Sequence, residues 1–263
     1  MRALRLVLML LTALIASPVL AKMVVKPVEW TLDGTTFDSR LVYDDDSMAK
    51  RPGLVMVPNW YGINDIAIEK AKKIAGKDYV ILLTDMYGKG TRPKGDEDAK
   101  AAVTPLYKDR AMMRKRIVKA FEQLEAAAAG APIDRARLAA IGFCFGGAVA
   151  LDLARSGAPA KAVVAFHGDL STDNPALARN IKARVLAMNG ADDAFTMPDA
   201  PKFVEAMKQS PADWQFVEIG HAVHCFTETE ATSPTGMCRY DAKVAARSYA
   251  MMREWLAQSF ASN

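Results

Sequence analysis

The stretch Ile141-Gly142-Phe143-Cys144-Phe145-Gly146-Gly147 decides the fold. It joins an apolar run that predicts a buried strand, Leu138 to Phe143, directly to an Ala-rich run that predicts a helix, Gly146 to Arg155. A strand-turn-helix corner of the form Gly-x-Cys-x-Gly holds a nucleophilic side chain on a sharp turn, where glycines permit strained backbone and close packing. The positive end of the helix dipole there favours a thiolate. Cys144 is therefore the candidate nucleophile, although a free cysteine often serves only as a small buried hydrophobe.

Residues 1–21 predict a secretory signal that does not belong to the fold. Arg2 and Arg5 form a basic start, Leu6 to Ile15 is an apolar run, and Ala16 to Ala21 ends in small residues that signal peptidases favour. The apolar run is shorter than the roughly 20 residues that span a bilayer, which argues against an uncleaved anchor. We therefore expect cleavage after Ala21, an exported protein (periplasmic or secreted), and a single domain over residues 22–263.

The composition is that of an ordinary globular protein, with 51% hydrophobic and 24% charged residues in 263. The net charge of +4 falls to +2 once the signal is removed, because that segment holds two arginines and no acidic residue. No dense basic stripe is present, so we expect neither nucleic-acid binding nor, after cleavage, membrane association. The three histidines, His167, His221 and His224, lack metal-site spacing, so we expect no metal and no other cofactor.

The order of the remaining elements predicts an α/β fold. Val24 to Trp30 and Phe37 to Tyr43 flank the turn Asp33-Gly34 and predict an N-terminal antiparallel hairpin. Further strands are predicted at 54–57, 79–83, 138–143, 162–166, 184–188 and 214–219; helices are predicted at 64–74, 110–129, 146–155, 198–209 and 240–260; and a polar loop is predicted at 91–98. This alternation predicts a mostly parallel central sheet with helices on both faces and a ligand site at the carboxyl ends of the strands.

Acidic residues and histidines follow the later strands. Asp192 and Asp193 follow one strand end, and His221 and His224 follow the last strand. A thiol nucleophile needs a base and an orienting acid, and the order nucleophile, acid, histidine is that of the α/β-hydrolase fold. One of the two aspartates could instead cap a helix or solvate a turn, and one of the histidines could serve in packing.

These motifs resemble those of the dienelactone hydrolase (carboxymethylenebutenolidase) family. The resemblance rests on Gly142 to Gly147, Gly190-Ala191-Asp192-Asp193, Val223-His224-Cys225-Phe226, Trp60 to Asp65 and Thr84 to Gly88. It implies a triad that assigns Cys144 as nucleophile, Asp193 as orienting acid and His224 as base. It also implies an oxyanion hole made by the backbone N–H groups of Trp60 and Phe145.

The chain departs from the family pattern at three positions. Asn59 stands where the family often has a glutamate that tunes the thiol, and Lys89 and Glu228 stand where substrate-binding arginines are expected. The candidate substrate-binding residues are Asn59, Tyr61, Lys89 and His167. The sequence leaves the acyl and leaving groups open.

The three cysteines suggest one further feature. If Cys144 must stay free to react, Cys225 and Cys238 remain to form a disulfide in an oxidising compartment. We therefore predict a cysteine-dependent hydrolase of a carboxylic ester or lactone that works through an acyl-enzyme. The alternatives are a broad-range esterase or thioesterase with the same site, a catalytically weak binding protein on the same fold, and a thiol-redox role for Cys144. Its partner would be a small-molecule substrate, and a monomer is favoured.

Overall fold

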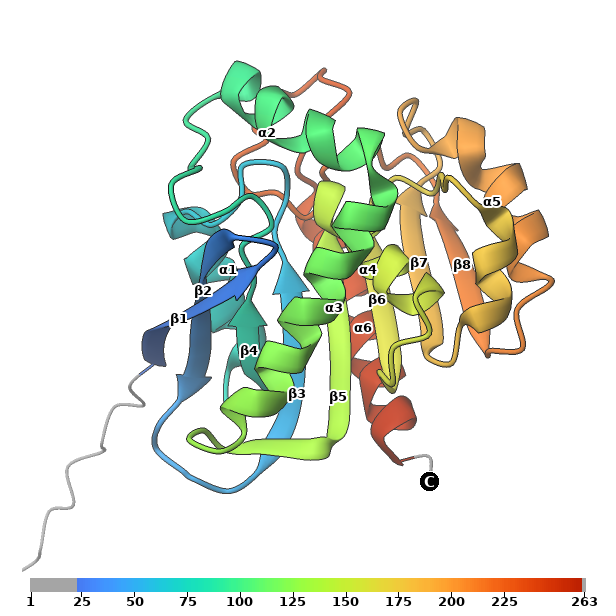
Figure 1. Cartoon of the computed structure of the whole chain (residues 1–263). Coiled ribbons are helices and arrows are strands. Elements are labelled where there is room, and N and C mark those ends of the chain that lie inside the picture. Colours follow the sequence, from blue (N-terminus) through green and yellow to red (C-terminus); the bar gives the residue numbers. More distant parts are fainter. Residues whose placement is uncertain (1–22, 262–263) are drawn as a thin grey trace, which may run out of the picture.

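The central feature of the computed structural model is an eight-stranded sheet with helices on both faces (Figure 1). The structure describes residues 23–261, so the predicted signal at 1–21 lies outside the described residues. The strands are β1 (Met23–Leu32), β2 (Thr35–Asp44), β3 (Arg51–Val57), β4 (Val80–Leu83), β5 (Ile133–Phe143), β6 (Ala162–Phe166), β7 (Arg184–Gly190) and β8 (Trp214–Ile219). The helices are α1 (Asp65–Ala75), α2 (Asp96–Lys108), α3 (Arg110–Ala127), α4 (Phe145–Arg155), α5 (Ala200–Met207) and α6 (Ala242–Ala261), with short 3₁₀ turns η1 (Pro175–Asn180) and η2 (Met197–Asp199).

The sheet is mostly parallel, as the alternating elements predict. Its strand order is β1-β2-β4-β3-β5-β6-β7-β8. β1 and β2 pair antiparallel across Asp33-Gly34, both of which have positive φ, and β2 also pairs antiparallel with β4. All other neighbouring strands are parallel. The α/β-hydrolase fold with an N-terminal antiparallel hairpin is therefore confirmed.

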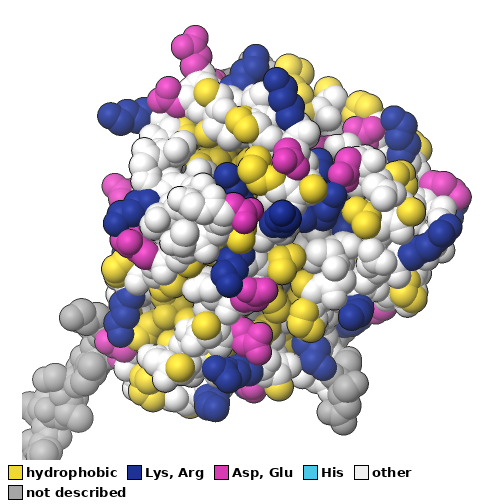
Figure 2. All heavy atoms as spheres, viewed as in Figure 1, with side chains coloured by type: hydrophobic (Ala, Val, Ile, Leu, Met, Phe, Trp, Pro, Cys, Tyr) yellow, Lys and Arg dark blue, Asp and Glu magenta, His cyan; other side chains and the backbone are white. Residues whose placement is uncertain are grey.

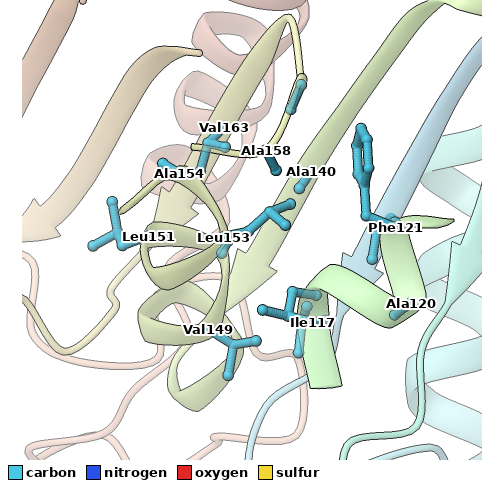
Figure 3. Packing of buried hydrophobic residues seen from close by; sticks show 14 of the residues in the cluster. Ile117, Ala120, Phe121, Ala140, Val149, Leu151, Leu153, Ala154, Ala158 and Val163 are labelled. Carbon is cyan, nitrogen blue, oxygen red and sulfur yellow. The ribbon is translucent and has the colours of Figure 1, made fainter. Parts of the chain in front are cut away.

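The two faces of the sheet bury two separate sets of apolar side chains. In β3, Val55 and Val57 belong to the apolar layer that includes α3, α4 and α5, whereas Leu54 and Met56 belong to the layer that includes α1 and α6. The period of two along the strand produces this division, and a strand buried on both faces is an almost continuous apolar run. Figure 3 shows the first layer, where α3 contributes Ile117 and α4 contributes Val149 and Leu153 above β5 and β6.

One helix was not predicted. The polar stretch 91–98 was expected to be a loop, but α2 begins within it at Asp96. Three consecutive acidic residues, Asp96, Glu97 and Asp98, occupy the first turn, where the helix dipole stabilises negative charge. Gly95 supplies no side-chain cap and Pro105 interrupts the last turns, which weakens the usual helix signals. The consequence is that Asp96 is held at a fixed place beside the site described below.

The loops that carry polar residues meet at the carboxyl ends of the parallel strands. The segments after β3, β5, β6, β7 and β8 hold, in that order, Asn59, Cys144, His167, Asp193 and His224. On the face of Figure 2, side chains of both charges are interspersed with hydrophobic ones. Among residues 23–261, no helix is long and apolar enough to cross a membrane.

Candidate active site

Cys144 lies on the sharp turn between β5 and α4, with φ 53° and ψ −119°. Residues other than glycine rarely adopt such a backbone conformation. Its backbone N–H donates to the carbonyl of Phe166 at 3.0 Å, which fixes the turn against β6. A Cβ on Gly142 would lie 1.9 Å from the Gly146 carbonyl oxygen, and a Cβ on Gly146 would lie 2.2 Å from the Val57 carbonyl oxygen. Only glycine fits at these two positions, so the motif is explained by backbone packing.

His224 and Asp193 extend in line from the thiol. Nε2 of His224 lies 3.2 Å from Sγ of Cys144, and Nδ1 lies 2.7 Å from Oδ2 of Asp193. Burial opposes a charge on His224, but the neighbouring thiolate and carboxylate outweigh it and raise the pKa of His224 to about 10. Burial also opposes the charge of Asp193, yet its hydrogen bonds hold the pKa of Asp193 below its ordinary value. The geometry places a histidine within reach of the Cys144 thiol and a carboxylate behind the histidine, the arrangement that activates a nucleophilic cysteine.

The structure distinguishes between the paired candidates. Asp193 is buried, and its carboxylate accepts from the Thr196 hydroxyl at 2.7 Å in addition to contacting His224. Asp192 and His221 instead face solvent, with Oδ2 of Asp192 4.0 Å from Nδ1 of His221. The structure therefore brings Asp193 and His224 to Cys144 and leaves the other pair at the surface.

The segment that carries His224 is cross-linked next to it. Cys225 and Cys238 form a disulfide, while Cys144 is free. The Arg239 backbone N–H donates to the carbonyl of His224 at 2.9 Å. The residue next to His224 is thus fixed covalently. His224 itself is held at its backbone carbonyl by Arg239 and at its side chain by Asp193.

His167 lies beneath the turn of Cys144 and not in a cavity. Its side chain is fully buried, Nδ1 accepts from the backbone N–H of Cys144 at 3.2 Å, and Nε2 lies 2.7 Å from Oγ1 of Thr227. Burial lowers the pKa of His167 to about 4, so the ring is neutral near pH 7, with its proton on Nε2. The expectation that His167 contacts substrate is therefore corrected: its ring supports the backbone turn of Cys144 from below.

A buried ion pair continues this chain of hydrogen bonds. Glu228, whose side chain is 3% exposed, accepts from Nζ of Lys70 at 2.6 Å, from Nδ2 of Asn59 at 2.6 Å and from the Thr227 hydroxyl at 3.1 Å. Burial opposes ionisation of Glu228, but the ammonium of Lys70 outweighs it and holds the pKa of Glu228 below its usual range. A chain of hydrogen bonds therefore runs from the backbone of Cys144 through His167 and Thr227 to Glu228. Glu228 in turn is hydrogen-bonded to Asn59 in the segment after β3.

The two predicted oxyanion donors belong to segments that pack together. A Cβ on Gly146 would lie 2.5 Å from the carbonyl oxygen of Pro58, so the segment after β3 touches the start of α4. Tyr87 bridges them, because its hydroxyl donates to the Trp60 carbonyl at 2.8 Å and its ring stacks on Phe145 with centroids 5.7 Å apart. An oxyanion hole requires N–H donors from two such segments beside the nucleophile.

A cavity of about 390 Å³ opens above the thiol. Its lining residues come from five segments: Asn59, Trp60, Tyr61, Asp96, Cys144, Phe195, His224, Cys225, Glu228, Glu230, Ala231 and Cys238. Two of the predicted substrate-binding residues, Asn59 and Tyr61, are among them. Lys89 is not: it forms an ion pair with Glu29 of β1 at the protein surface, so its predicted role is corrected.

Within the described part of the chain, one group of acidic residues is close enough to hold a metal ion. It comprises Asp44, Asp45 and Asp46 at the end of β2. Because β2 runs antiparallel to β4, this group lies near the amino ends of the parallel strands, whereas Cys144 lies at their carboxyl ends. It takes no part in the site.

Several residues of the site were not predicted. Lys70, Thr227, Glu230 and Phe195 contact the site or line its cavity, although no local motif marks them. In the sequence, Glu228 stands out only as a departure from the family pattern. The one sequence signal that Lys70 is buried is its place on α1, one turn after Ala67 and directly before Ala71, both of which are buried.

Comparison with known proteins agrees with this architecture. The model of the dienelactone hydrolase family matches residues 37–260. Among solved structures, m3DLH is 36% identical with a TM-score of 0.83 and covers 91% of this chain and 99% of its own. A dienelactone hydrolase-like promiscuous phosphotriesterase, P91, from metagenomic libraries is 34% identical with a TM-score of 0.80, covering 90% and 98%. A protein of Bradyrhizobium sp. named as a probable 2-oxo-3-(5-oxofuran-2-ylidene)propanoate lactonase is 27% identical, covering 76% of this chain and 84% of its own. The chain belongs to the dienelactone hydrolase family of hydrolases, which act on esters and lactones.

Proposed function

We propose that the chain hydrolyses a carboxylic ester or lactone through a covalent acyl-cysteine. The observation that carries the proposal is the alignment of Cys144 Sγ, His224 and Asp193 at 3.2 Å and 2.7 Å. The thiolate attacks the substrate carbonyl, and the backbone N–H groups of Phe145 and Trp60 stabilise the oxyanion, an effect worth several kcal/mol. His224 protonates the leaving alkoxide and then activates the water that releases the acyl group, while Asp193 fixes its tautomer.

A substrate panel with and without thiol alkylation tests this mechanism. A p-nitrophenyl ester, a thioester and an unsaturated lactone are incubated with the protein before and after treatment with iodoacetamide. We expect turnover that alkylation abolishes, and intact mass spectrometry should detect one acyl group, absent in Cys144→Ala. Turnover that survives in folded Cys144→Ala would refute the nucleophile assignment. Preference within the panel separates lactonase from esterase and thioesterase activity, and failure on every member would favour a binding role.

Phosphotriester hydrolysis is a second candidate activity of the same site. It is favoured by the likeness to P91, a dienelactone hydrolase-like promiscuous phosphotriesterase. Release of 4-nitrophenol from diethyl 4-nitrophenyl phosphate measures it. Turnover that requires Cys144 would support this activity, and turnover equal to that of Cys144→Ala would reject it.

The reaction is proposed to take place outside the cytoplasm. The basic and apolar pattern of residues 1–21 carries this proposal, and the Cys225–Cys238 disulfide supports it because such bonds persist in oxidising compartments. N-terminal sequencing of the protein recovered from its host should begin at Lys22. A mature chain that begins at Met1 would contradict it.

A further inference from the structure

The cavity above Cys144 is lined by three acidic side chains, two of which have no matching cation among the described side chains. Asp96, Glu228 and Glu230 contribute to its lining, and none of the lining residues is lysine or arginine. Glu228 is neutralised by Lys70, which lies behind it at 2.6 Å. Two carboxylates, those of Asp96 and Glu230, remain to set the charge of the cavity.

The partners of these two carboxylates are neutral. Asp96 accepts from the Tyr61 hydroxyl at 2.5 Å, and Glu230 accepts from the Asn59 amide at 3.2 Å. Within residues 23–261, neither acid forms an ion pair, and Oε2 of Glu230 is buried with no hydrogen-bond partner. An unpartnered buried carboxylate oxygen is costly, and a nearby positive charge offsets that cost.

Aromatic rings complete the wall of the cavity. Trp60 and Tyr61 meet edge to face with centroids 5.5 Å apart, and Phe195, which is 57% exposed, packs against the ring of His224. The negative faces of aromatic rings attract cations, and rings combined with carboxylates are the chemistry that recognises substituted ammonium groups. An anionic group would meet like charges here, and the one basic side chain of the lining, His224, is already hydrogen-bonded to Asp193 and Cys144.

We propose that this cavity selects an ester whose acyl or alcohol part carries a positive charge, with Asp96 and Glu230 as the specificity-determining residues. The inference rests on the proposed function, whose substrate class it narrows. Carboxylate-bearing esters and lactones are disfavoured by the same two residues.

The reaction rate of Cys144 with charged thiol reagents tests the inference without any hydrolysis. Cys144 is the one free cysteine, so methanethiosulfonates bearing trimethylammonioethyl, ethyl or sulfonatoethyl groups modify a single site. We expect the cation-to-anion rate ratio to exceed that of a small free thiol by about tenfold at low salt, and to fall in 1 M NaCl. Glu230→Gln and Asp96→Asn, which keep their hydrogen-bonded oxygens, should each lower it several-fold. Glu205→Gln on α5, an exposed site outside the cavity lining, should not.

Matched substrates provide the second measurement. The 4-nitrophenyl esters of 4-(trimethylammonio)butanoate, 5,5-dimethylhexanoate and glutarate differ mainly in terminal charge. We expect kcat/KM to decrease in that order. The ratio of kcat/KM for the cationic ester to kcat/KM for the neutral ester should shrink in Glu230→Gln. Equal reagent ratios for Cys144 and the free thiol, or ratios unmoved by both substitutions, would overturn the inference even if all three esters were hydrolysed. Hydrolysis of none of them, with the reagent preference intact, would instead overturn the proposed function.

Discussion

Replacement of Lys70 by methionine removes one partner of the buried ion pair that joins α1 to the site. The side chains of Lys70 and Glu228 are 12% and 3% exposed and 2.6 Å apart. Loss of one partner from such a pair typically costs 3–5 kcal/mol, because the remaining charge stays buried without compensation. The hydrogen bonds from Asn59 and Thr227 to Glu228 survive the change, so we expect a loss of about 3 kcal/mol in the free energy of unfolding at pH 7.

The double variant Lys70→Met/Glu228→Gln isolates the cause of that loss. It removes both charges and keeps an amide oxygen for Asn59, so we expect it to recover more than half of the stability lost in Lys70→Met. Lys73→Met is the matched control, because Lys73 is an exposed lysine on the same helix and its replacement should change stability by less than about 0.5 kcal/mol. Urea unfolding followed by tryptophan fluorescence measures all three, with an unchanged slope as a check on the comparison.

The stability difference between the wild type and Lys70→Met should depend on pH through the ionisation of Glu228. In the wild type the pKa of Glu228 lies below its ordinary value, so its contribution to stability is present at neutral pH and is lost as the pH falls through that lowered pKa. In Lys70→Met the pKa of Glu228 should rise, because the cation is gone and burial remains. The stability difference between the two proteins should therefore shrink as the pH falls from 7 towards 4. A loss below about 1 kcal/mol at pH 7, or a double variant no more stable than Lys70→Met, would refute the role of the pair.

The remaining predictions concern the groups around the nucleophile. Asp193→Asn should lower kcat by about 10⁴-fold while Asp192→Asn changes it by less than about threefold, and the reverse ranking in initial-rate assays would show that Asp192 is the orienting acid. The alkaline limb of the activity profile, set near pH 10 by His224, should move to lower pH in Asp193→Asn, and a limb that stays in place would contradict the pairing. The folded pKa of His167 is about 4, so the unfolded chain binds a proton at this residue before the folded chain does. The free energy of unfolding should therefore fall by about 3 kcal/mol between pH 6.5 and pH 4. His167→Gln should flatten that part of the plot of unfolding free energy, measured with urea, against pH. Cys238→Ser opens the short loop that the disulfide closes and should cost about 3 kcal/mol; an unchanged urea midpoint would show that the disulfide does not stabilise the fold.

The sequence predicted the elements whose signals are local. Apolar runs located the strands, and the glycines around Cys144 located the turn, because both depend on residues close together in the chain. Helix α2 was missed for the same reason: Gly95 and Pro105 are local signals of a break, and the packing of Val103 and Leu106 that stabilises the helix is tertiary.

The interactions that organise the site join residues far apart in the chain. Lys70 and Glu228 are 158 positions apart, and no local motif in the sequence pairs them. His167 follows a strand as a substrate-binding residue would, and only the packing of Thr227 over it shows that it is buried. Residue type and spacing therefore predicted the candidate nucleophile and the chain order of its candidate partners, whereas the charge compensation and the burial of the site residues depended on the fold.

The close backbone contacts of Gly142 and Gly146 determine where this enzyme can be altered. Any side chain added at either position would collide with main-chain carbonyls, which cannot move without displacing β3 or α4. Laboratory evolution for new substrates should therefore accumulate changes in the cavity wall, at positions such as Tyr61 and Phe195, and none at the two glycines. Reactivity and selectivity are thereby assigned to different parts of the chain, so one can be redesigned while the other is left intact.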